Sequence, residues 1–317
     1  MDNVTSLVSI VIPAYNHAGY LDEAIQSVLA QTYPNVELIV LNDGSTDETA
    51  EVLRRWGDRF RWETHANMGQ SATLNKGWGI AHGEILGYLS ADDALTPEAV
   101  STAIAEFLAY PDAIATYCDF NLIDPRSRII RRVSAGDFSL SEMVATVTCP
   151  PGPGSFFKRS CYEKIDPWDI SLKQMPDYDF WLRLGMQGEV MHIRKVLANF
   201  RVHPTSQTFA PMSATRADEP MRIISRFFEN TSLAESLVAL KPTAMANACL
   251  VSAQLHIRAA RLRQAASRIK TAWLYDPKCL LSSRAARLIL NALLNRASHT
   301  LLWIVRGIVG GALGKNN

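Results

Sequence analysis

Asp92 and Asp93 form a pair of carboxylates directly after the short apolar run Ile85–Leu89. A buried strand that ends at paired acids points them out of the carboxyl end of a parallel sheet, where open α/β folds bind ligands. Two such carboxylates seldom both stay ionised unless a cation or hydrogen-bond donors compensate them. Oxygen ligands favour a hard cation, Mg²⁺ or Mn²⁺, shared with substrate phosphates. The alternative is an acidic first turn of a helix predicted over Ala94–Tyr110, and the pair alone does not decide between the two.

Two earlier apolar runs also end at polar loops. Val8–Ile12 is followed by Pro13, Ala14, Tyr15 and Asn16, and Val36–Leu41 is followed by Asn42–Glu48. Ser45 and Glu48 have the spacing of a capping box, which predicts that a helix begins here. Apolar residues at helical spacing join the two runs. Strand, helix, strand and helix of this length predict βαβ units and a parallel sheet.

A third strand is predicted over Phe60–Glu63, followed by a loop with Asn67 and Gly69 and by another helix. Asn75 and Gly77 lie inside that helix, although both are poor helix formers. Residues placed against propensity often allow a close approach to a ligand, and helix–sheet packing explains a glycine equally well. Both explanations stay open at this point.

The composition is that of a globular protein, with 317 residues, 48% hydrophobic and 20% charged. One large domain with an appendage is expected from this length. The five cysteines form no metal-binding spacing, and no signal peptide precedes them. We therefore expect a reducing compartment, the cytoplasm.

The net charge of +1 conceals an asymmetry along the chain. Residues 236–317 contain twelve Lys or Arg residues against a single acid, Asp276, and the remainder is acidic. A basic C-terminal third predicts an anionic partner, a membrane surface or a polymer. Nucleic acid is disfavoured, because no nucleic-acid-binding motif accompanies the charge.

The order and spacing of four motifs resemble those of family 2 glycosyltransferases, which are inverting, nucleotide-sugar-dependent enzymes of the GT-A fold. The motifs are Pro13–Asn16, Asn42–Asp47, Asn67-x-Gly69 with Asn75-x-Gly77, and Ala91–Asp93. The resemblance covers about residues 6 to 210. It implies an α/β fold with a Rossmann-like, mostly parallel sheet flanked by helices.

The resemblance implies that the first loop and Asp43 hold the nucleotide of the donor. Tyr15 would lie against the base, beside Pro13, Ala14 and Asn16. Asp43 would accept a hydrogen bond from a base N–H, although an aspartate in a turn is often purely structural. Asn75 and Asp92 complete the predicted nucleotide-sugar site.

The resemblance also implies a Mg²⁺ or Mn²⁺ cofactor bound by Asp92, Asp93 and His203. Asp93 would bind the metal itself, and His203, in a closing Arg-x-His-Pro loop, would approach the metal and the diphosphate. A lone histidine is more often structural, so its position in the motif carries this assignment. The family often has an aspartate where this chain has Ser90, so one carboxylate is missing.

Pro176–Leu184 resembles the later acidic motif of the family, with Pro176 in place of the usual glutamate. Residues two apart in a helix point about 200° away from each other, so only one of Asp177 and Asp179 can face the sugar. Arg183 follows Asp179 by four residues, which predicts an ion pair and leaves Asp177 as the candidate catalytic base. The alternative is that Asp177 is only a helix N-cap.

Residues 213–317 are predicted to form a helical region after a catalytic domain of residues 1–212. Ala244–Arg261 and Gln264–Tyr275 resemble one tetratricopeptide-like helix pair, expected to pack on the catalytic domain because such repeats do not stand alone. A last helix, Arg284–Leu313, is apolar apart from a narrow polar stripe that includes Arg306. It is interrupted too often to span a membrane. An in-plane membrane helix and a helix that packs in a homodimer both fit.

The expected activity is inverting transfer of a hexose from a nucleotide diphosphate sugar, UDP-linked, to a hydroxyl acceptor. The acceptor would be a saccharide or lipid-linked saccharide, in cell-surface polysaccharide or glycolipid biosynthesis at the inner face of the cell membrane. One alternative is a non-catalytic protein that binds sugar nucleotides or polysaccharide. A nucleotidyltransferase is disfavoured, because Val8–Asn16 lacks the Gly-rich basic loop of such enzymes.

Overall fold

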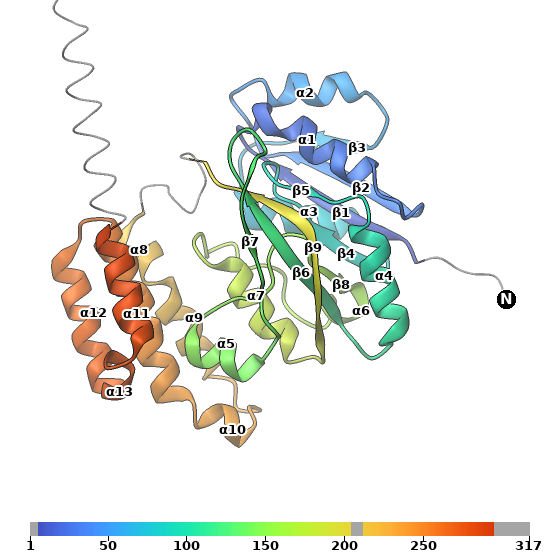
Figure 1. Ribbon diagram of the computed structural model, residues 1–317. Coiled ribbons are helices and arrows are strands. Elements are labelled where there is room, and N and C mark those ends of the chain that lie inside the picture. The colour runs from blue at the N-terminus through green and yellow to red at the C-terminus, as the bar shows by residue number, and fades with distance from the viewer. Residues whose placement is uncertain (1–5, 204–211, 295–317) are drawn as a thin grey trace, which may run out of the picture. The chain divides into compact units, whose positions relative to one another are not determined.

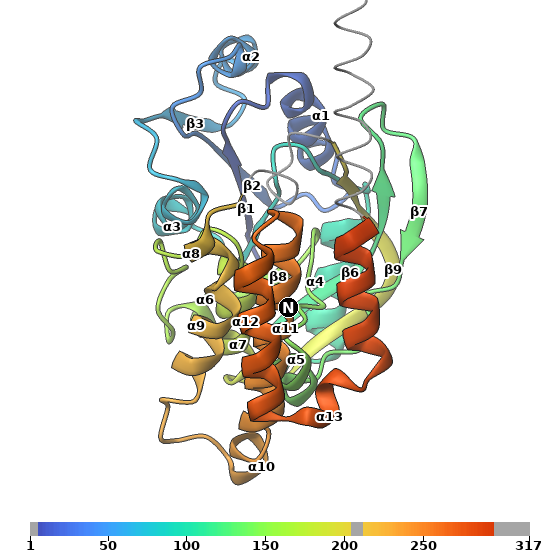
Figure 2. The same cartoon turned by 90° about the vertical axis from the view of Figure 1, so that its left-hand side faces the viewer.

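Figures 1 and 2 show the computed structural model, which describes residues 6–203 and 212–294. The chain divides into two compact units. The first comprises Met1–Leu140 and Cys149–Phe209, and the second comprises Ser141–Thr148 and Ala210–Asn317. The domain boundary after residue 212 stays a prediction, and residues 141–148, which precede that boundary in the sequence, belong to the second unit.

The first unit is built on a mixed sheet, with described strands in the order β3-β2-β1-β4-β8-β6-β9-β5 and with β7 beside β6. β1 is parallel to β2 and β4, and β2 is parallel to β3. β8 is antiparallel to β4 and β6, and β6 lies parallel to the long β9 (Figure 1). The strands are β1 Val8–Ala14, β2 Val36–Asn42, β3 Arg61–Thr64, β4 Ile85–Tyr88, β5 Ala94–Leu95, β6 Ala115–Ile123, β7 Ile129–Val133, β8 Phe156–Lys158 and β9 Val190–Arg201.

Helices of this unit bury apolar side chains against the sheet. Leu21 and Ile25 of the first helix pack in one core with Ile10, Ile12 and Val40 of the strands. The helices are α1 Ala18–Leu29, α2 Thr49–Trp56, α3 Gln70–Ile80, α4 Ala99–Ala109, α6 Arg159–Tyr162 and α7 Pro176–Gly185.

Gly77 in α3 is explained by helix–sheet packing. A Cβ at this position would lie 2.4 Å from Cγ1 of Val11 in β1, a separation that real Cβ atoms do not show. The structure therefore resolves the alternative left open for this glycine, because the close approach is to the sheet.

Two local predictions are wrong. No capping box opens α2, because the Ser45 hydroxyl accepts a hydrogen bond from the Asn16 N–H (3.0 Å). The helix predicted from Ala94 begins only at Ala99, because Ala94–Leu95 pair with β9 as strand β5. The acid pair Asp92 and Asp93 therefore does not lie in the first turn of a helix.

The described part of the second unit is helical. α11 and α12 lie side by side in Figures 1 and 2 and correspond to the predicted helix pair. Small and apolar side chains, among them Ala246, Leu250 and Ala272, form its core. The helices are α5 Leu140–Thr146, α8 Ala214–Ala217, α9 Glu219–Phe227, α10 Glu235–Val238, α11 Lys241–Arg258, α12 Leu262–Tyr275 and α13 Pro277–Leu280, followed by helical residues 283–294.

The predicted last helix is described only as far as residue 294, so its continuation to Leu313, with Arg306, lies outside the described residues. Among residues 6–203 and 212–294, no helix is both long and apolar enough to cross a membrane.

Candidate active site

Two imidazoles and one carboxylate from three distant parts of the chain meet at one place. Oδ2 of Asp92 lies 2.9 Å from Nε2 of His203 and 3.7 Å from Nε2 of His17. One ligand atom of each residue lies within 4.8 Å of the other two, so these residues fit a single cation. The structure thus brings together two predicted metal residues, Asp92 and His203, and adds His17, which sequence reasoning missed.

The sheet topology explains this meeting. His17 follows the carboxyl end of β1 and Asp92 follows that of the parallel neighbour β4. The short antiparallel pairing of β5 with β9 then brings the acid pair beside the last residues of β9. His203 stands two residues beyond that strand.

Arg201 fastens the acid pair to the end of β9. Its backbone N–H donates to Oδ1 of Asp93 (2.8 Å) and its Nε donates to the backbone oxygen of Asp92 (2.7 Å). The guanidinium is buried, pairs with Glu23 (2.6 Å) and lies 4.8 Å from the ring centre of Tyr20. Arg201 therefore fixes the backbone from which Asp92 projects.

Asp93 is placed differently from its neighbour. It is only 3% exposed, and burial, together with the charge of Asp92, raises its pKa well above the ordinary value. It does not belong to the group formed by His17, Asp92 and His203. Its role as a metal ligand stays a prediction, and its observed contact is the hydrogen bond from Arg201.

The first loop presents one exposed aromatic side chain. Tyr15 is 45% exposed just beyond β1, whereas Pro13 and Ala14 are buried within that strand. Asn16 has a positive φ of 56°, and its side-chain oxygen accepts from the Thr46 N–H (2.7 Å). The predicted nucleotide loop is thus tied to the second loop, and Tyr15 is left with a free face.

Asp43 connects the second and third loops. Its carboxylate accepts from the N–H groups of Met68 (2.6 Å) and Gly69 (2.9 Å), and it is buried. Gly69 has a φ of +87°, a conformation that favours glycine. A direct contact of Asp43 with the base stays a prediction, and the observed contacts give this aspartate a role in shaping the loop.

Asn75 has both ends of its side chain engaged. Nδ2 donates to the Trp168 backbone oxygen (2.8 Å) and Oδ1 accepts from the Trp168 N–H (3.0 Å). The Trp168 ring in turn contacts Trp78 and Phe180 in an aromatic cluster. Asn75 thereby positions the chain around Trp168, and any contact with a donor stays a prediction.

Asp177 occupies the second position of α7, after the N-cap Met175, so the interpretation of Asp177 as the N-cap is wrong. Its Oδ1 accepts from the N–H of Tyr178 (2.8 Å), and burial raises the pKa of its carboxyl. The predicted ion pair of Asp179 with Arg183 is confirmed at 2.8 Å.

Tyr88, the last residue of β4, relates Asp177 to the acid pair. Burial raises the pKa of Tyr88 well above the ordinary value, and the charges of Asp177, Cys149 and Asp93 raise it further. The Tyr88 ring centre lies 5.4 Å from that of Trp168, and the Trp168 ring centre lies 6.0 Å from that of Phe180 in α7. The helix that carries Asp177 therefore packs close to the end of β4, which the acid pair follows.

Comparisons with known proteins assign the chain to a family. Residues 9–161 match the family described as Glycosyl transferase family 2. An uncharacterized glycosyltransferase of Nostoc sp. is 30% identical over 225 residues, which span 67% of this chain and 70% of the relative. The chain belongs to glycosyltransferase family 2.

Other relatives match a similar share of this glycosyltransferase. An uncharacterized glycosyltransferase of Rickettsia typhi is 35% identical over 210 residues, 64% of this chain and 66% of that protein. Hyaluronan synthase of Pasteurella multocida is 30% identical over 205 residues, 63% of this chain and 21% of the synthase. The match thus spans just under two thirds of the first protein and a much smaller part of the second.

Solved structures confirm the GT-A fold of the glycosyltransferase. TarS 1–349 from S. aureus, in complex with UDP-GlcNAc, has a TM-score of 0.68 and 17% identity, over 93% of this chain and 92% of that chain. Mannosyltransferase PcManGT from Pyrobaculum calidifontis, in complex with GDP-Man and Mn²⁺, has a TM-score of 0.60 and 15% identity, over 94% and 88%.

Proposed function

We propose that this glycosyltransferase moves a sugar, with inversion, from a UDP-linked donor to a hydroxyl of a saccharide or lipid-linked saccharide. The observation that carries the proposal is the meeting of Asp92, His203 and His17 beyond the carboxyl ends of β1 and β4. The UDP-GlcNAc complex of TarS supports the donor class. The likeness to hyaluronan synthase supports a role in cell-surface polysaccharide or glycolipid synthesis.

Each side chain has a separate task in this proposal. Asp92 and His203 would hold Mg²⁺ or Mn²⁺, and such a cation offsets the charge that develops on a leaving diphosphate. Asp177 would accept the proton of the acceptor hydroxyl, and its raised pKa makes the ionised carboxylate a stronger base than an exposed aspartate. Tyr15 would offer its exposed ring to the base of the donor.

A donor screen tests the proposal. The full-length protein is incubated with UDP- and GDP-sugars in Mn²⁺, Mg²⁺ or EDTA, with and without saccharide acceptors, and release of nucleoside diphosphate is followed. We expect release that requires a cation and prefers UDP. Binding of a donor without release under any of these conditions would instead identify a non-catalytic sugar-nucleotide-binding protein.

We also propose that the basic second unit brings the enzyme to an anionic membrane surface at the cytoplasmic face. Basic residues accumulate there, and apolar side chains such as Trp273, Leu274 and Leu281 are half or more exposed. Basic and apolar groups together favour anionic lipid surfaces.

Sedimentation with anionic liposomes tests this location. Full-length protein should sediment at low salt and be released at high salt, and a truncation before Ser283 should lose sedimentation while it keeps donor hydrolysis. Protein that stays in the supernatant at low salt would favour internal or homodimer packing of the last helix.

A further inference from the structure

We propose that His17 completes the cation site with Asp92 and His203, and that this two-histidine, one-carboxylate site prefers a first-row transition-metal ion such as Mn²⁺ over Mg²⁺. This preference rests on the proposed function, because the same ion would contact the donor diphosphate. The proposed function allows either Mg²⁺ or Mn²⁺, and the present proposal chooses between them.

The hydrogen bond at the far side of the His17 ring determines which nitrogen carries the proton. Nδ1 of His17 lies 2.7 Å from the backbone oxygen of Tyr15, which can only accept. Nδ1 is therefore the donor, and in the neutral ring Nε2 carries a lone pair. This pattern, in which a backbone carbonyl holds the outer ring nitrogen, is typical of metal-binding histidines.

In the neutral ring, the lone pair on Nε2 of His17 faces a carboxylate oxygen of Asp92. Nε2 lies 3.7 Å from Oδ2 of Asp92, too far for a hydrogen bond, and makes no other hydrogen bond among the described residues. Two electron-rich atoms at this separation repel each other unless positive charge lies between them. A cation shared by His17, Asp92 and His203 supplies that charge.

The separations suit one ion. Ligands held about 2.1 Å from a metal lie about 3.0 Å apart when adjacent in an octahedron and about 4.2 Å apart when opposite. The separations in the cluster are 2.9 Å for His203 to Asp92 and 3.7 Å for His17 to Asp92, and all ligand atoms lie within 4.8 Å of one another. Small side-chain movements would bring all of them onto one cation, with positions left for diphosphate oxygens.

The surroundings hold the ligands in place. The His203 side chain is 2% exposed, and its ring centre lies 5.0 Å from that of Tyr20. The guanidinium of Arg201 lies on the Tyr20 ring and also fastens the backbone of Asp92. His17 is the N-cap residue of α1, and its backbone N–H donates to the Thr49 hydroxyl (3.2 Å).

The ligand types decide the choice of metal. Mg²⁺ prefers oxygen ligands and water, whereas imidazole favours ions from Mn²⁺ toward Zn²⁺ in the first transition series. Without His17 the site would hold one imidazole and one carboxylate, and with it two of the three protein ligands are nitrogen. His17 is therefore the residue expected to set the preference.

Metal binding measured without a donor tests the proposal. Full-length protein is titrated with MnCl₂ and with MgCl₂ by calorimetry, and bound Mn²⁺ is followed by electron paramagnetic resonance. We expect at least about tenfold tighter binding of Mn²⁺ than of Mg²⁺. His17→Ala should weaken Mn²⁺ binding by about tenfold or more and change Mg²⁺ binding little, and His17→Asp should shift the preference toward Mg²⁺. His82→Ala, which removes an imidazole that is 71% exposed and pairs with Glu37, is the matched control.

Equal affinities of the wild type for the two ions would overturn the proposal, as would His17→Ala with unchanged Mn²⁺ affinity. If the His17 variants do not fold, electron spin-echo spectroscopy of Mn²⁺ bound to the wild type decides, because it counts the coordinated imidazole nitrogens: two are expected, and one would overturn the proposal. Tight Mn²⁺ binding without sugar transfer would overturn the proposed function and leave this site standing. Sugar transfer by a protein that binds Mn²⁺ and Mg²⁺ equally well would overturn the proposed metal preference and leave the proposed function standing.

Discussion

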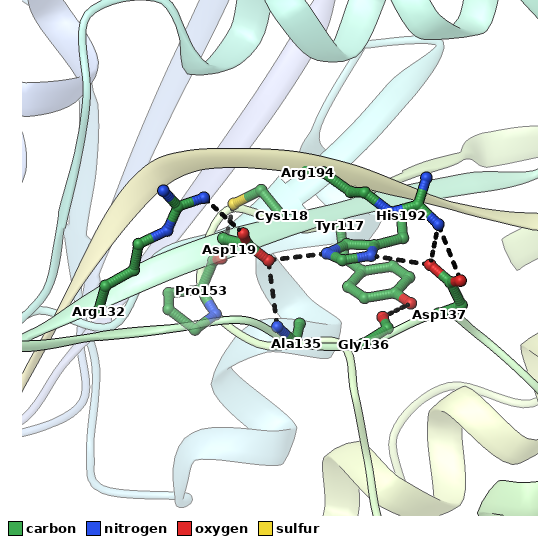
Figure 3. Close-up of polar contacts among 10 residues, drawn as sticks. All are labelled: Tyr117, Cys118, Asp119, Arg132, Ala135, Gly136, Asp137, Pro153, His192 and Arg194. Atoms are coloured by element: carbon green, nitrogen blue, oxygen red, sulfur yellow. Dashed lines mark hydrogen bonds and ion pairs between the residues drawn. The ribbon is translucent and has the colours of Figure 1, made fainter.

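Two histidine–aspartate clusters of the first unit differ in the ratio of rings to carboxylates. In one, a single ring, that of His192, lies between two acids: Nε2 is 2.8 Å from Asp119 and Nδ1 is 3.2 Å from Asp137 (Figure 3). In the other, the rings of His17 and His203 both approach one oxygen of Asp92.

In the cluster around His192, hydrogen-bond donors and acceptors are matched. Asp119 also accepts from Arg132 (2.9 Å) and from the Ala135 N–H (3.1 Å), so both of its oxygens have donors. The His192 ring stacks on Tyr117 (Figure 3). The two ring centres lie 5.0 Å apart. These contacts hold the segment after β7 against β6 and β9. Donors and acceptors match here without a further group.

The cluster around Asp92 has a different balance of rings and carboxylates. One carboxylate oxygen faces two ring nitrogens, and the outer nitrogen of His17 already has its acceptor. The comparison suggests that the balance of donors and acceptors separates a structural histidine–aspartate contact from a ligand site. Mutations in the two places should therefore have opposite consequences for activity and for stability.

The largest expected effect is on transfer by Asp177→Asn, at the proposed catalytic base. The amide oxygen can still accept from the Tyr178 N–H but cannot take a proton. We expect a loss of turnover on the order of 10²- to 10⁴-fold, with normal folding and donor binding. Turnover and donor affinity are measured separately. Near-normal turnover here, with loss in Asp179→Asn instead, would reverse the assignment of the base.

Asp92→Asn should weaken Mn²⁺ binding by on the order of 100- to 1,000-fold, because a neutral amide is a poor ligand for a divalent cation. The free energy of unfolding of the metal-free protein should not fall, since the repulsion between carboxylate and lone pair is removed. Calorimetry and urea unfolding measure the two quantities. A metal affinity like that of the wild type would show that Asp92 is not the anchor of the site.

Asp119→Asn should lower the stability of the protein and leave metal binding unchanged. The side chain is 3% exposed and receives bonds from Arg132 and His192, so the amide leaves buried donors poorly matched. We expect a loss of about 1–3 kcal/mol in the free energy of unfolding, with metal affinity unchanged. Asp137→Asn, at a carboxylate that is 69% exposed, is the control and should change stability little. Lost metal binding in Asp119→Asn would remove the distinction between the clusters.

Sequence motifs predicted the sheet, because each motif follows an apolar strand and parallel strands bring their carboxyl ends to one edge. The resemblance to family 2 glycosyltransferases, and not the strand pattern, placed Asp92 and His203 in one site. It could not find His17, because the only signal in the sequence is its position directly after Asn16, and its partners lie far along the chain. The pairing of β5 with β9 brings these residues together, and that pairing also overturned the helix predicted from Ala94.

Side-chain hydrogen bonds account for the remaining differences. Ser45 has a capping-box spacing, but its hydroxyl is used by Asn16, a contact between two loops that local sequence does not encode. The contact of Asn75 with the donor stays a prediction, and the match of its amide to Trp168, 93 residues away, is a contact that the sequence did not reveal. The His192 cluster was not predicted, because its acids come from a neighbouring strand and a loop.

A third histidine–aspartate contact, in the second unit, extends the comparison. Asp218 accepts from the Ser252 hydroxyl (2.7 Å), lies 3.1 Å from Nε2 of His256 and pairs with Arg268 (2.7 Å). Nδ1 of the buried His256 accepts from Nε of Arg261 (2.9 Å), and Arg268 supplies positive charge beside Asp218. As in the cluster around His192, donors and acceptors are matched here without a metal.

The smallest expected effect is the pH dependence of this third contact. Burial by itself would raise the pKa of Asp218, but the hydrogen bonds from Arg268, Ser252 and His256 lower it from 3.8 to about 2. A carboxyl whose pKa is depressed by folding stabilises the protein above its unfolded value, and this contribution is lost as the pH falls from about 4 toward 2. The shift corresponds to about 1–2 kcal/mol after allowance for a side chain that is 29% exposed. In urea unfolding, Asp218→Asn should therefore be less stable than the wild type by this amount at pH 6, and the difference should shrink as the pH is lowered to 3. A difference that stays constant with pH would show that packing around the amide, and not the charge of Asp218, stabilises the unit.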